Sequence, residues 1–169
     1  MEIKYRSVQT NDAEALIEHI RSVGRETDFL SFDGDTFNIS IEREQRFITR
    51  FLSSGYDYMI VALDGEKIVG NAAFEGERTK RYSHRCNLSI SVLREYWGIG
   101  IGSVLMEMLI AEAKFRGFEI ISLEVRADND RAIELYRRFG FEIIGTYRSF
   151  FKINNEYFDA YYMNLYLKK

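Results

Sequence analysis

The sequence predicts an α+β fold in which helices flank one central, mixed and largely antiparallel sheet. Short runs that alternate apolar and polar residues are separated by runs with helical spacing, in the expected order βααβββαβαββ. Two turn signals, Asp64-Gly65 and Asn154-Asn155, join neighbouring strands directly and so indicate hairpins. No linker, repeat or low-complexity stretch interrupts the chain, so residues 1–169 are expected to form a single domain.

The N-terminal part of the chain is predicted to form one strand and two amphipathic helices. Residues 2–8 alternate as a strand, and Thr10 or Asn11 is expected to cap the helix that follows. Periodicity is lost over 24–38, and Ser40 is expected to cap the second helix. The apolar stripes are Ala13, Leu16, Ile17 and Ile20 in the first helix and Phe47, Ile48, Phe51 and Leu52 in the second.

The middle and last parts of the chain supply the rest of the sheet. A basic loop precedes an apolar strand and three alternating glycines, and a helix opens after them. This helix is expected to end near Gly117, and a later one is stopped by Gly140. The expected strands are 57–63, 67–74, 88–93, 120–125, 141–153 and 157–167, and the expected helices are 104–115 and 129–139.

Length and composition indicate a soluble globular protein. Of 169 residues, 46% are apolar and 29% charged, and the length allows a substantial core. The net charge of −3 gives no support for a nucleic-acid partner, and no apolar run approaches the roughly 18 residues of a membrane span. The lone Cys86 and the lack of an apolar leader favour a cytoplasmic location. With only His19 and His84 available and no ligand spacing, we expect no metal.

The stretch 90–103 has the pattern of an anion-binding site. A β-branched strand ends in Gly98, Gly100 and Gly102, and a helix opens directly after them. Free backbone N–H groups at the positive end of a helix dipole bind phosphate, and glycines let a ligand approach the backbone. No Lys follows Gly102, which excludes a Walker loop, and a dinucleotide fingerprint would need its third glycine at Ser103.

The element order and this turn together resemble the GNAT family, the GCN5-related N-acetyltransferases. A second block, at 123–141, is similar to the family signature L-x-V…N-x-x-A-I-x-L-Y-x-x-x-G-F, which makes the resemblance specific over 88–141. The run 123–126 is similar to ribosomal-protein N-terminal acetyltransferases, whereas 151–159 is closer to members that act on small amines and amino acids. The residues of the second block are Leu123-Glu124-Val125-Arg126-Ala127-Asp128-Asn129, Ala132-Ile133, Leu135-Tyr136 and Phe139-Gly140-Phe141.

The resemblance implies a GNAT-type acyl-CoA N-acyltransferase fold and an enzyme that uses acetyl-CoA. Strands 88–93 and 120–126 are expected to splay apart, with the pantetheine arm of acetyl-CoA between them. Acetyl would pass directly to a primary amine of a small molecule, an amino acid or a peptide N-terminus, and two copies of the chain could form a homodimer. Trp97 stands where the family usually has Arg or Gln. The implied cofactor-binding residues are Ile90, Val92, Trp97, Gly98, Ile99, Gly100, Ile101, Gly102, Ser103, Asn129 and Tyr136.

Acetyl transfer to an amine needs an acid, a base and a donor to the carbonyl oxygen. A backbone N–H near Val92 is a candidate donor. Tyr136 stands at the position of the family's general acid, although an aromatic at helical spacing is also typical of a core. Glu124 is the candidate base, and a salt bridge with Arg126 or exposure to solvent would explain it equally well. Asn129 is expected to cap the following helix and to contact the cofactor.

Other polar residues are alternatives to these assignments. Glu75 at a hairpin end and His84 in the basic loop are further candidate bases, each also explained as a surface residue. The segment 24–39 is expected beside the acceptor, where its acids would favour neutral or cationic amines over acidic ones. These acids are Glu26, Asp28, Asp33 and Asp35.

Two other functions stay open on the sequence alone. A catalytically silent acyl-CoA-binding sensor would share the fold; Trp97 leaves room for it, while Tyr136 argues against it. A dinucleotide-binding oxidoreductase is disfavoured by Ser103 and by the antiparallel hairpins.

Overall fold

The computed structural model describes residues 2–167, which form a seven-stranded sheet and four α-helices in the predicted order. The strands lie in the order β1-β2-β3-β4-β5-β7-β6, and all neighbours are antiparallel except β4 and β5. The strands are β1 Ile3–Ser7, β2 Tyr58–Asp64, β3 Lys67–Gly76, β4 Arg85–Val92, β5 Ile120–Arg126, β6 Glu142–Ile153 and β7 Glu156–Tyr166. The helices are α1 Ala13–Glu26, α2 Ile41–Ser53, α3 Ile101–Phe115 and α4 Asp130–Arg138, with short 3₁₀ turns at Thr10–Asp12 and Arg94–Tyr96.

The helix caps confirm one prediction and correct another. The Ser40 hydroxyl accepts a hydrogen bond from the Arg43 N–H at 3.3 Å, so Ser40 caps α2 as predicted. Neither Thr10 nor Asn11 caps α1, because a 3₁₀ turn precedes it and Asp12 is the residue before the helix. Arg6 holds the Asp12 carboxylate in a bidentate pair at 2.6 and 2.7 Å, an interaction that local sequence does not reveal.

Positive φ angles mark two turns, one between β6 and β7 and one before α3. Asn154 and Asn155 have φ angles of 49° and 65°, the left-handed conformation that asparagine tolerates in a tight hairpin turn, as predicted. Gly100, with φ 93°, is the residue before α3. The helix therefore begins at Ile101, three residues before the predicted start, and Gly102 and Ser103 belong to its first turn.

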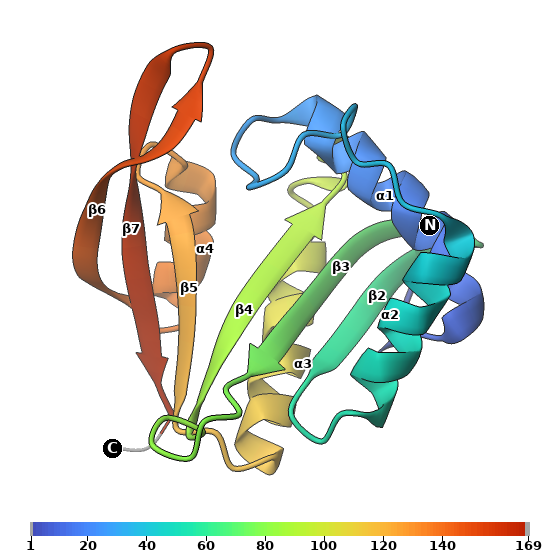
Figure 1. Cartoon of the computed structure of the whole chain (residues 1–169), viewed down its shortest axis with the longest axis horizontal. Helices are drawn as coiled ribbons and strands as arrows, with labels where there is room; N and C mark the ends of the chain where they lie inside the picture. The colour runs from blue at the N-terminus through green and yellow to red at the C-terminus, as the bar shows by residue number, and fades with distance from the viewer. Residues whose placement is uncertain (1, 168–169) are drawn as a thin grey trace.

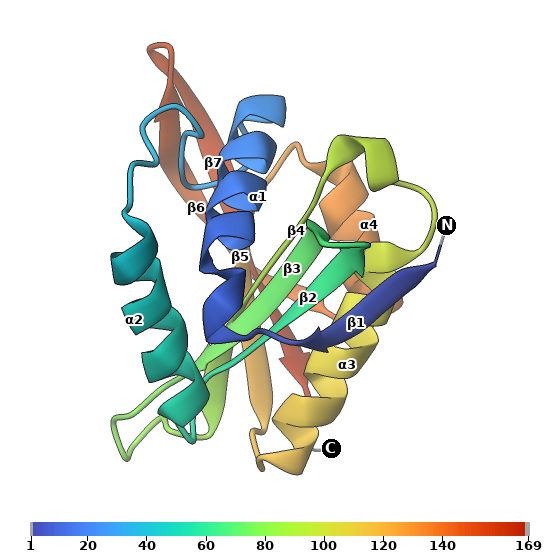
Figure 2. The ribbon, with the colours of Figure 1, turned by 90° about the vertical axis from the view of Figure 1, so that its right-hand side faces the viewer.

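Helices cover both faces of the sheet. Figure 2 shows α1 and α2 on one face and α3 and α4 on the other. Apolar residues of α1 and α2 pack on Met59, Val61 and Ala73, which point to the first face of β2 and β3. The alternate residues Ile60, Ala72 and Phe74 point to the second face and belong to the larger core around α3.

The central parallel pair separates, as predicted. Arg85, Cys86 and Asn87 of β4 pair with Ile120, Ile121 and Ser122 of β5, and no pairing follows. Beyond this point β4 leans toward β3 while β5 stays with β7 (Figure 1). We call the resulting opening the β4–β5 gap.

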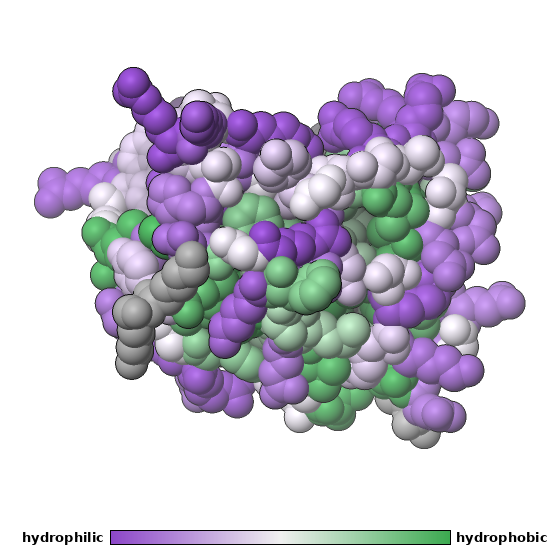
Figure 3. Space-filling model, turned by 90° about the horizontal axis from the view of Figure 1, so that it is seen from below, coloured by the Kyte–Doolittle hydropathy of each residue, from purple (hydrophilic) through white to green (hydrophobic). Residues whose placement is uncertain are grey.

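The lower end of the molecule, as oriented in Figure 1, carries both hydrophobic and hydrophilic residues on its surface. Viewed from below, hydrophobic residues gather near the middle and hydrophilic side chains extend around them (Figure 3). Between residues 2 and 167, no helix is both long enough and apolar enough to cross a membrane.

Candidate functional site

A cleft of about 830 Å³ extends from the glycine turn across the β4–β5 gap to the inner sides of α1 and α2. It brings together residues that are distant in the sequence. Ile99 is the exception among the predicted cofactor residues: its side chain is 57% exposed and does not line the cleft. The predicted residues that do line it are Ile90, Val92, Trp97, Gly98, Gly100, Ile101, Gly102, Ser103, Glu124, Asn129 and Tyr136.

The glycine turn presents a row of backbone N–H groups. Within the described chain, the N–H groups of Gly98 through Gly102 donate to no protein acceptor. The Ser103 N–H does not belong to this row, because it donates to the Gly100 carbonyl at 3.0 Å. A Cβ built on Gly98 or Gly100 would meet no protein atom within 4 Å, so the space beside the turn is open to a ligand. These features fit a bound phosphate.

Trp97 holds the turn against the end of β4. Its Nε1–H donates to the Val92 carbonyl at 2.7 Å. The guanidinium groups of Arg131 and Arg94 lie 4.7 and 5.6 Å from the Trp97 ring centroid. Trp97 therefore has a structural role, and Arg131 brings to the turn a positive charge that Trp97 lacks.

Val92 presents its backbone N–H to the gap. The Leu93 N–H donates to the Val69 carbonyl at 2.9 Å, so Leu93 faces β3. Backbone groups alternate in direction along a strand, and those of Val92 therefore face the opposite side, where β5 has already separated. This N–H is placed to meet a carbonyl oxygen inside the cleft.

Tyr136 is both a core residue and a lining residue of the cleft. It is 7% exposed, and its ring centroid lies 5.8 Å from that of Phe141. Burial raises the pKa of Tyr136 above its ordinary value. The hydroxyl thus keeps its proton at neutral pH and can act as a donor.

Glu124 is exposed on β5, on the cleft side of the sheet. The salt bridge with Arg126 is not formed: Arg126 pairs with Asp128 at 2.6 Å and with Asp28 at 3.2 Å. Cys86 and Ile121 are paired neighbours in the α3 core, so the alternate residue Glu124 faces the α1 and α2 side.

Of the remaining candidates, Asn129 and Glu75 line the cleft and His84 does not. Asn129 caps α4, with Oδ1 accepting from the Ala132 N–H at 3.3 Å. Burial raises the pKa of the Cys86 thiol to about 12, consistent with a buried core residue.

Of the four acids of segment 24–39, Glu26 lines the cleft as predicted, whereas Asp28, Asp33 and Asp35 do not. Asp28 pairs with Arg126, Asp35 pairs with Arg25 at 2.7 Å, and Asp33 accepts from the Asp35 N–H at 2.8 Å. Besides Glu26, the segment contributes Thr27, Phe29, Leu30, Ser31 and Phe32.

A buried histidine supports the floor of the cleft. His19 Nδ1 lies 3.2 Å from the Ile68 carbonyl, which can only accept, so Nδ1 carries the proton. Nε2 lies 2.9 Å from Ser91 Oγ, and the Ser91 hydroxyl donates to Asn71 Oδ1 at 2.8 Å. Burial lowers the pKa of His19 to about 4, so the ring is neutral at physiological pH.

Sequence reasoning missed Glu44, which is 3% exposed and lines the cleft from α2. Its spacing from Phe47, Ile48 and Phe51 places it on the apolar face of the helix. That spacing was the available signal, because an acid on an apolar face is either paired or functional.

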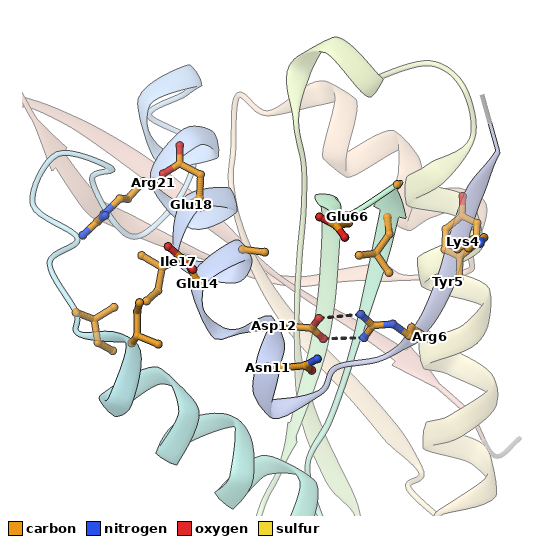
Figure 4. A pocket seen from close by; sticks show the side chains of 15 residues that line it. Lys4, Tyr5, Arg6, Asn11, Asp12, Glu14, Ile17, Glu18, Arg21 and Glu66 are labelled. Carbon is orange, nitrogen blue, oxygen red and sulfur yellow. Dashed lines mark hydrogen bonds and ion pairs between the residues drawn. The ribbon is translucent and has the colours of Figure 1, made fainter.

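A second pocket, of about 1100 Å³, lies between α1, β1 and the β2–β3 turn. Figure 4 shows the Arg6–Asp12 pair at its edge. Burial tends to raise the pKa of Asp12, but the Arg6 guanidinium holds it below its ordinary value. The pocket contains none of the predicted site residues. Across residues 2–167, no group of three or more potential ligand side chains could hold a metal ion.

Comparison with known sequences identifies the family. Residues 24–141 match the Acetyltransferase (GNAT) family, and the chain belongs to it. It is 34% identical over 110 residues to the L-amino acid N-acetyltransferase AaaT of Escherichia coli K12, covering 64% of this chain and 67% of that protein. It is 36% identical over 115 residues to the N-alpha-acetyltransferase RimI of Mycobacterium tuberculosis, covering 68% and 69%.

Solved structures agree with this assignment. A GNAT-family acetyltransferase from Streptococcus pneumoniae superposes with a TM-score of 0.95 at 30% identity, covering 98% of this chain and all of that one. A phosphinothricin acetyltransferase from Sinorhizobium meliloti, solved with acetyl-CoA, shares the fold with a TM-score of 0.85 at 24% identity, covering 99% and 89%. The protein is an acetyl-CoA-dependent N-acetyltransferase, which confirms the predicted fold and activity.

The glycine turn gives a prediction in which stability and affinity change in opposite directions. Gly102 lies in the first turn of α3, and an added Cβ would meet only Leu135 Cδ2, at 3.4 Å. Gly102→Ala should therefore raise the melting temperature, because alanine favours helix. The added Cβ should also keep the phosphate from closely approaching the backbone of the turn. Acetyl-CoA should therefore bind about tenfold or more weakly, since each N–H bond to a charged phosphate contributes about 1.5–3 kcal/mol.

Calorimetric titration with acetyl-CoA and thermal melting measure the two effects. Gly55→Ala is the matched control, because an added Cβ there meets no atom within 4 Å and Gly55 lies outside the cleft. Unchanged affinity in a folded Gly102→Ala variant would contradict the phosphate assignment.

His19 predicts a specific pH dependence of stability. Its pKa is about 4 in the folded chain and about 6.5 when unfolded, so the unfolded state takes up the proton first as the pH falls. The stabilising effect of neutral His19 should be complete above pH about 6.5. By pH about 4, the free energy of unfolding should have fallen by about 3 kcal/mol. Urea unfolding across this range should show a smaller loss in His19→Gln, and parallel curves would contradict the prediction.

Proposed function

We propose that residues 1–169 form one N-acetyltransferase domain that transfers acetyl directly to a primary amine of an amino acid, another small molecule or a peptide N-terminus. One observation carries this proposal: the free turn amides, the Val92 N–H, Tyr136 and Glu124 all line a single cleft that crosses the β4–β5 gap. The cleft reaches both faces of the sheet, so donor and acceptor can enter from opposite sides.

The turn residues would hold acetyl-CoA by its pyrophosphate. The N–H groups from Gly98 to Gly102 would donate to phosphate oxygens, and Arg131 would add positive charge. The acyl arm would lie in the β4–β5 gap beside Ile90 and Val92, whose backbone groups have no partner on β5. When bound, acetyl-CoA supplies an acetyl group activated as a thioester.

Three residues would then manage charge and protons during transfer. Glu124 would take a proton from the acceptor ammonium, which frees the nitrogen to form the new C–N bond. The Val92 N–H would donate to the acetyl oxygen as negative charge develops there. Tyr136 would give its proton to the sulfur as the C–S bond breaks. The nitrogen keeps two protons after the C–N bond forms and would release one of them to solvent, and solvent would restore the starting protonation of both side chains.

The acceptor class rests on relatives and on charge. AaaT is named for L-amino acids and RimI for N-terminal acetylation, and both kinds of acceptor present a primary amine. Release of the CoA thiol should be measured against a panel of amino acids, amines and peptides. The absence of turnover with every primary amine would overturn the acceptor proposal.

We expect Tyr136→Phe to reduce kcat on the order of 10²-fold with little change in acetyl-CoA affinity. The substitution removes one oxygen and retains the ring contact with Phe141. Pre-steady-state measurement of the chemical step, together with calorimetry, tests this. Normal rates in the Phe variant would return Tyr136 to a purely structural role.

Glu124→Gln should lower kcat/KM on the order of 10²-fold at neutral pH. The loss should shrink as the pH rises, because the acceptor amine then deprotonates without a base. Glu75→Gln is the matched comparison, since Glu75 is the other candidate base that lines the cleft. A larger loss in the Glu75 variant would transfer the base role to that residue.

The predictions about oligomeric state, location and other partners come from the sequence alone. A homodimer, a cytoplasmic location and the lack of nucleic-acid or membrane partners are predictions that composition and resemblance support. Light scattering of the purified chain tests the first of these.

A further inference from the structure

Glu44 is a buried carboxylate that the proposed transfer chemistry does not use. It is 3% exposed and shares the inner face of α2 with Phe47, Ile48 and Phe51. Around it the cleft is lined by apolar side chains from α1, α2, β2 and β3. These side chains are Leu16, Ile20, Phe47, Phe51, Met59 and Ala73.

Among the described residues, the Glu44 side chain forms no hydrogen bond and no ion pair. Burial alone raises its pKa, with no compensating partner. A carboxylate held in this way destabilises the free protein, because buried charge needs a partner. The cleft beside it offers the space where one can bind.

The position of Glu44 separates it from the reacting amine. The amine must reach the β4–β5 gap, whereas α2 packs over β2 (Figure 1). Since neighbouring strands are about 4.8 Å apart, β2 lies about 10 Å from β4. Glu44 therefore meets a different part of the acceptor, and the apolar side chains between them suit a chain of methylene groups.

Charge along the cleft favours a cation at this place. In the described chain, two Arg residues line the cleft, Arg131 and Arg138. Both belong to α4, which lies on the opposite side of the sheet from the proposed acceptor. Glu44, Glu75 and Glu124 line the acceptor side. An ammonium or guanidinium group would therefore approach Glu44 without a competing positive charge.

We propose that Glu44 binds the second cationic group of an acceptor that carries two: a primary amine at the β4–β5 gap and an ammonium or guanidinium group at the far end of an aliphatic chain. This inference rests on the proposed acetyltransferase function and specifies its acceptor. Two sources share the chemistry: free aliphatic diamines and amino acids or peptide N-termini with a basic side chain.

Two matched pairs of acceptors test the proposal and separate the sources. Hexylamine and its α,ω-diamine differ by one terminal amine, and norleucine amide and lysine amide differ in the same way. With the unchanged protein, the dication of at least one pair should have a kcat/KM about tenfold or more above its partner. The pair that shows the larger ratio identifies the source.

Substitution at Glu44 assigns the preference to this residue. Glu44→Gln should abolish the ratio through KM, leave turnover of the monoamine within about twofold, and unfold at the same or a higher temperature. Glu44→Asp keeps the charge on a shorter side chain and should retain part of the ratio. Glu42→Gln changes an exposed carboxylate of the same helix and should behave like the unchanged protein.

Calorimetric titration with the hexyl diamine gives a readout that does not need turnover. Tighter binding to the unchanged protein than to Glu44→Gln, without acetylation of any amine, would overturn the proposed transfer to amines while supporting the Glu44 site. Equal turnover of the two members of both pairs, or equal losses for both members in Glu44→Gln, would overturn the Glu44 inference. Equal diamine binding by the two proteins would do the same.

Discussion

The active site depends on how briefly β4 and β5 pair. Three residues of each strand form the parallel ladder, and the strands then separate between two well-packed halves of the sheet. Separation leaves backbone groups of Ile90 and Val92 without a strand partner. An unpaired N–H is costly in a dry interior, so such a gap is tolerated only where water or a ligand can reach it. The same feature that interrupts the sheet thus gives a substrate access to its backbone.

The gap also divides the cleft into two chemical environments. On the α3 and α4 side, the glycine turn presents N–H donors and Arg131 adds positive charge, and we propose that the phosphates bind there. On the α1 and α2 side, carboxylates line the part of the cleft where we propose that a cationic amine binds. In the proposed arrangement, the sheet would keep the phosphates of the donor away from these carboxylates, so each substrate would meet charge of the opposite sign.

Burial sets the protonation state of several residues in and around the cleft. It keeps the proton on Tyr136 and keeps His19 neutral, while Glu44 remains without a partner. The first two arrangements suit a donor and a rigid support. The third lowers the stability of the free protein, which is a cost often found where a protein binds a ligand of opposite charge.

Local features of the chain were sufficient to predict the order of elements, the glycine turn and the Ser40 cap, because periodicity, turn residues and caps act over a few residues. The two sequence blocks also brought Tyr136 and Glu124 forward as candidates. The pairing of Arg6 with Asp12, the partners of Asp28 and Asp35, and the isolation of Glu44 followed only from tertiary structure. Each depends on which distant segment packs against the residue, and spacing along the chain does not encode that contact.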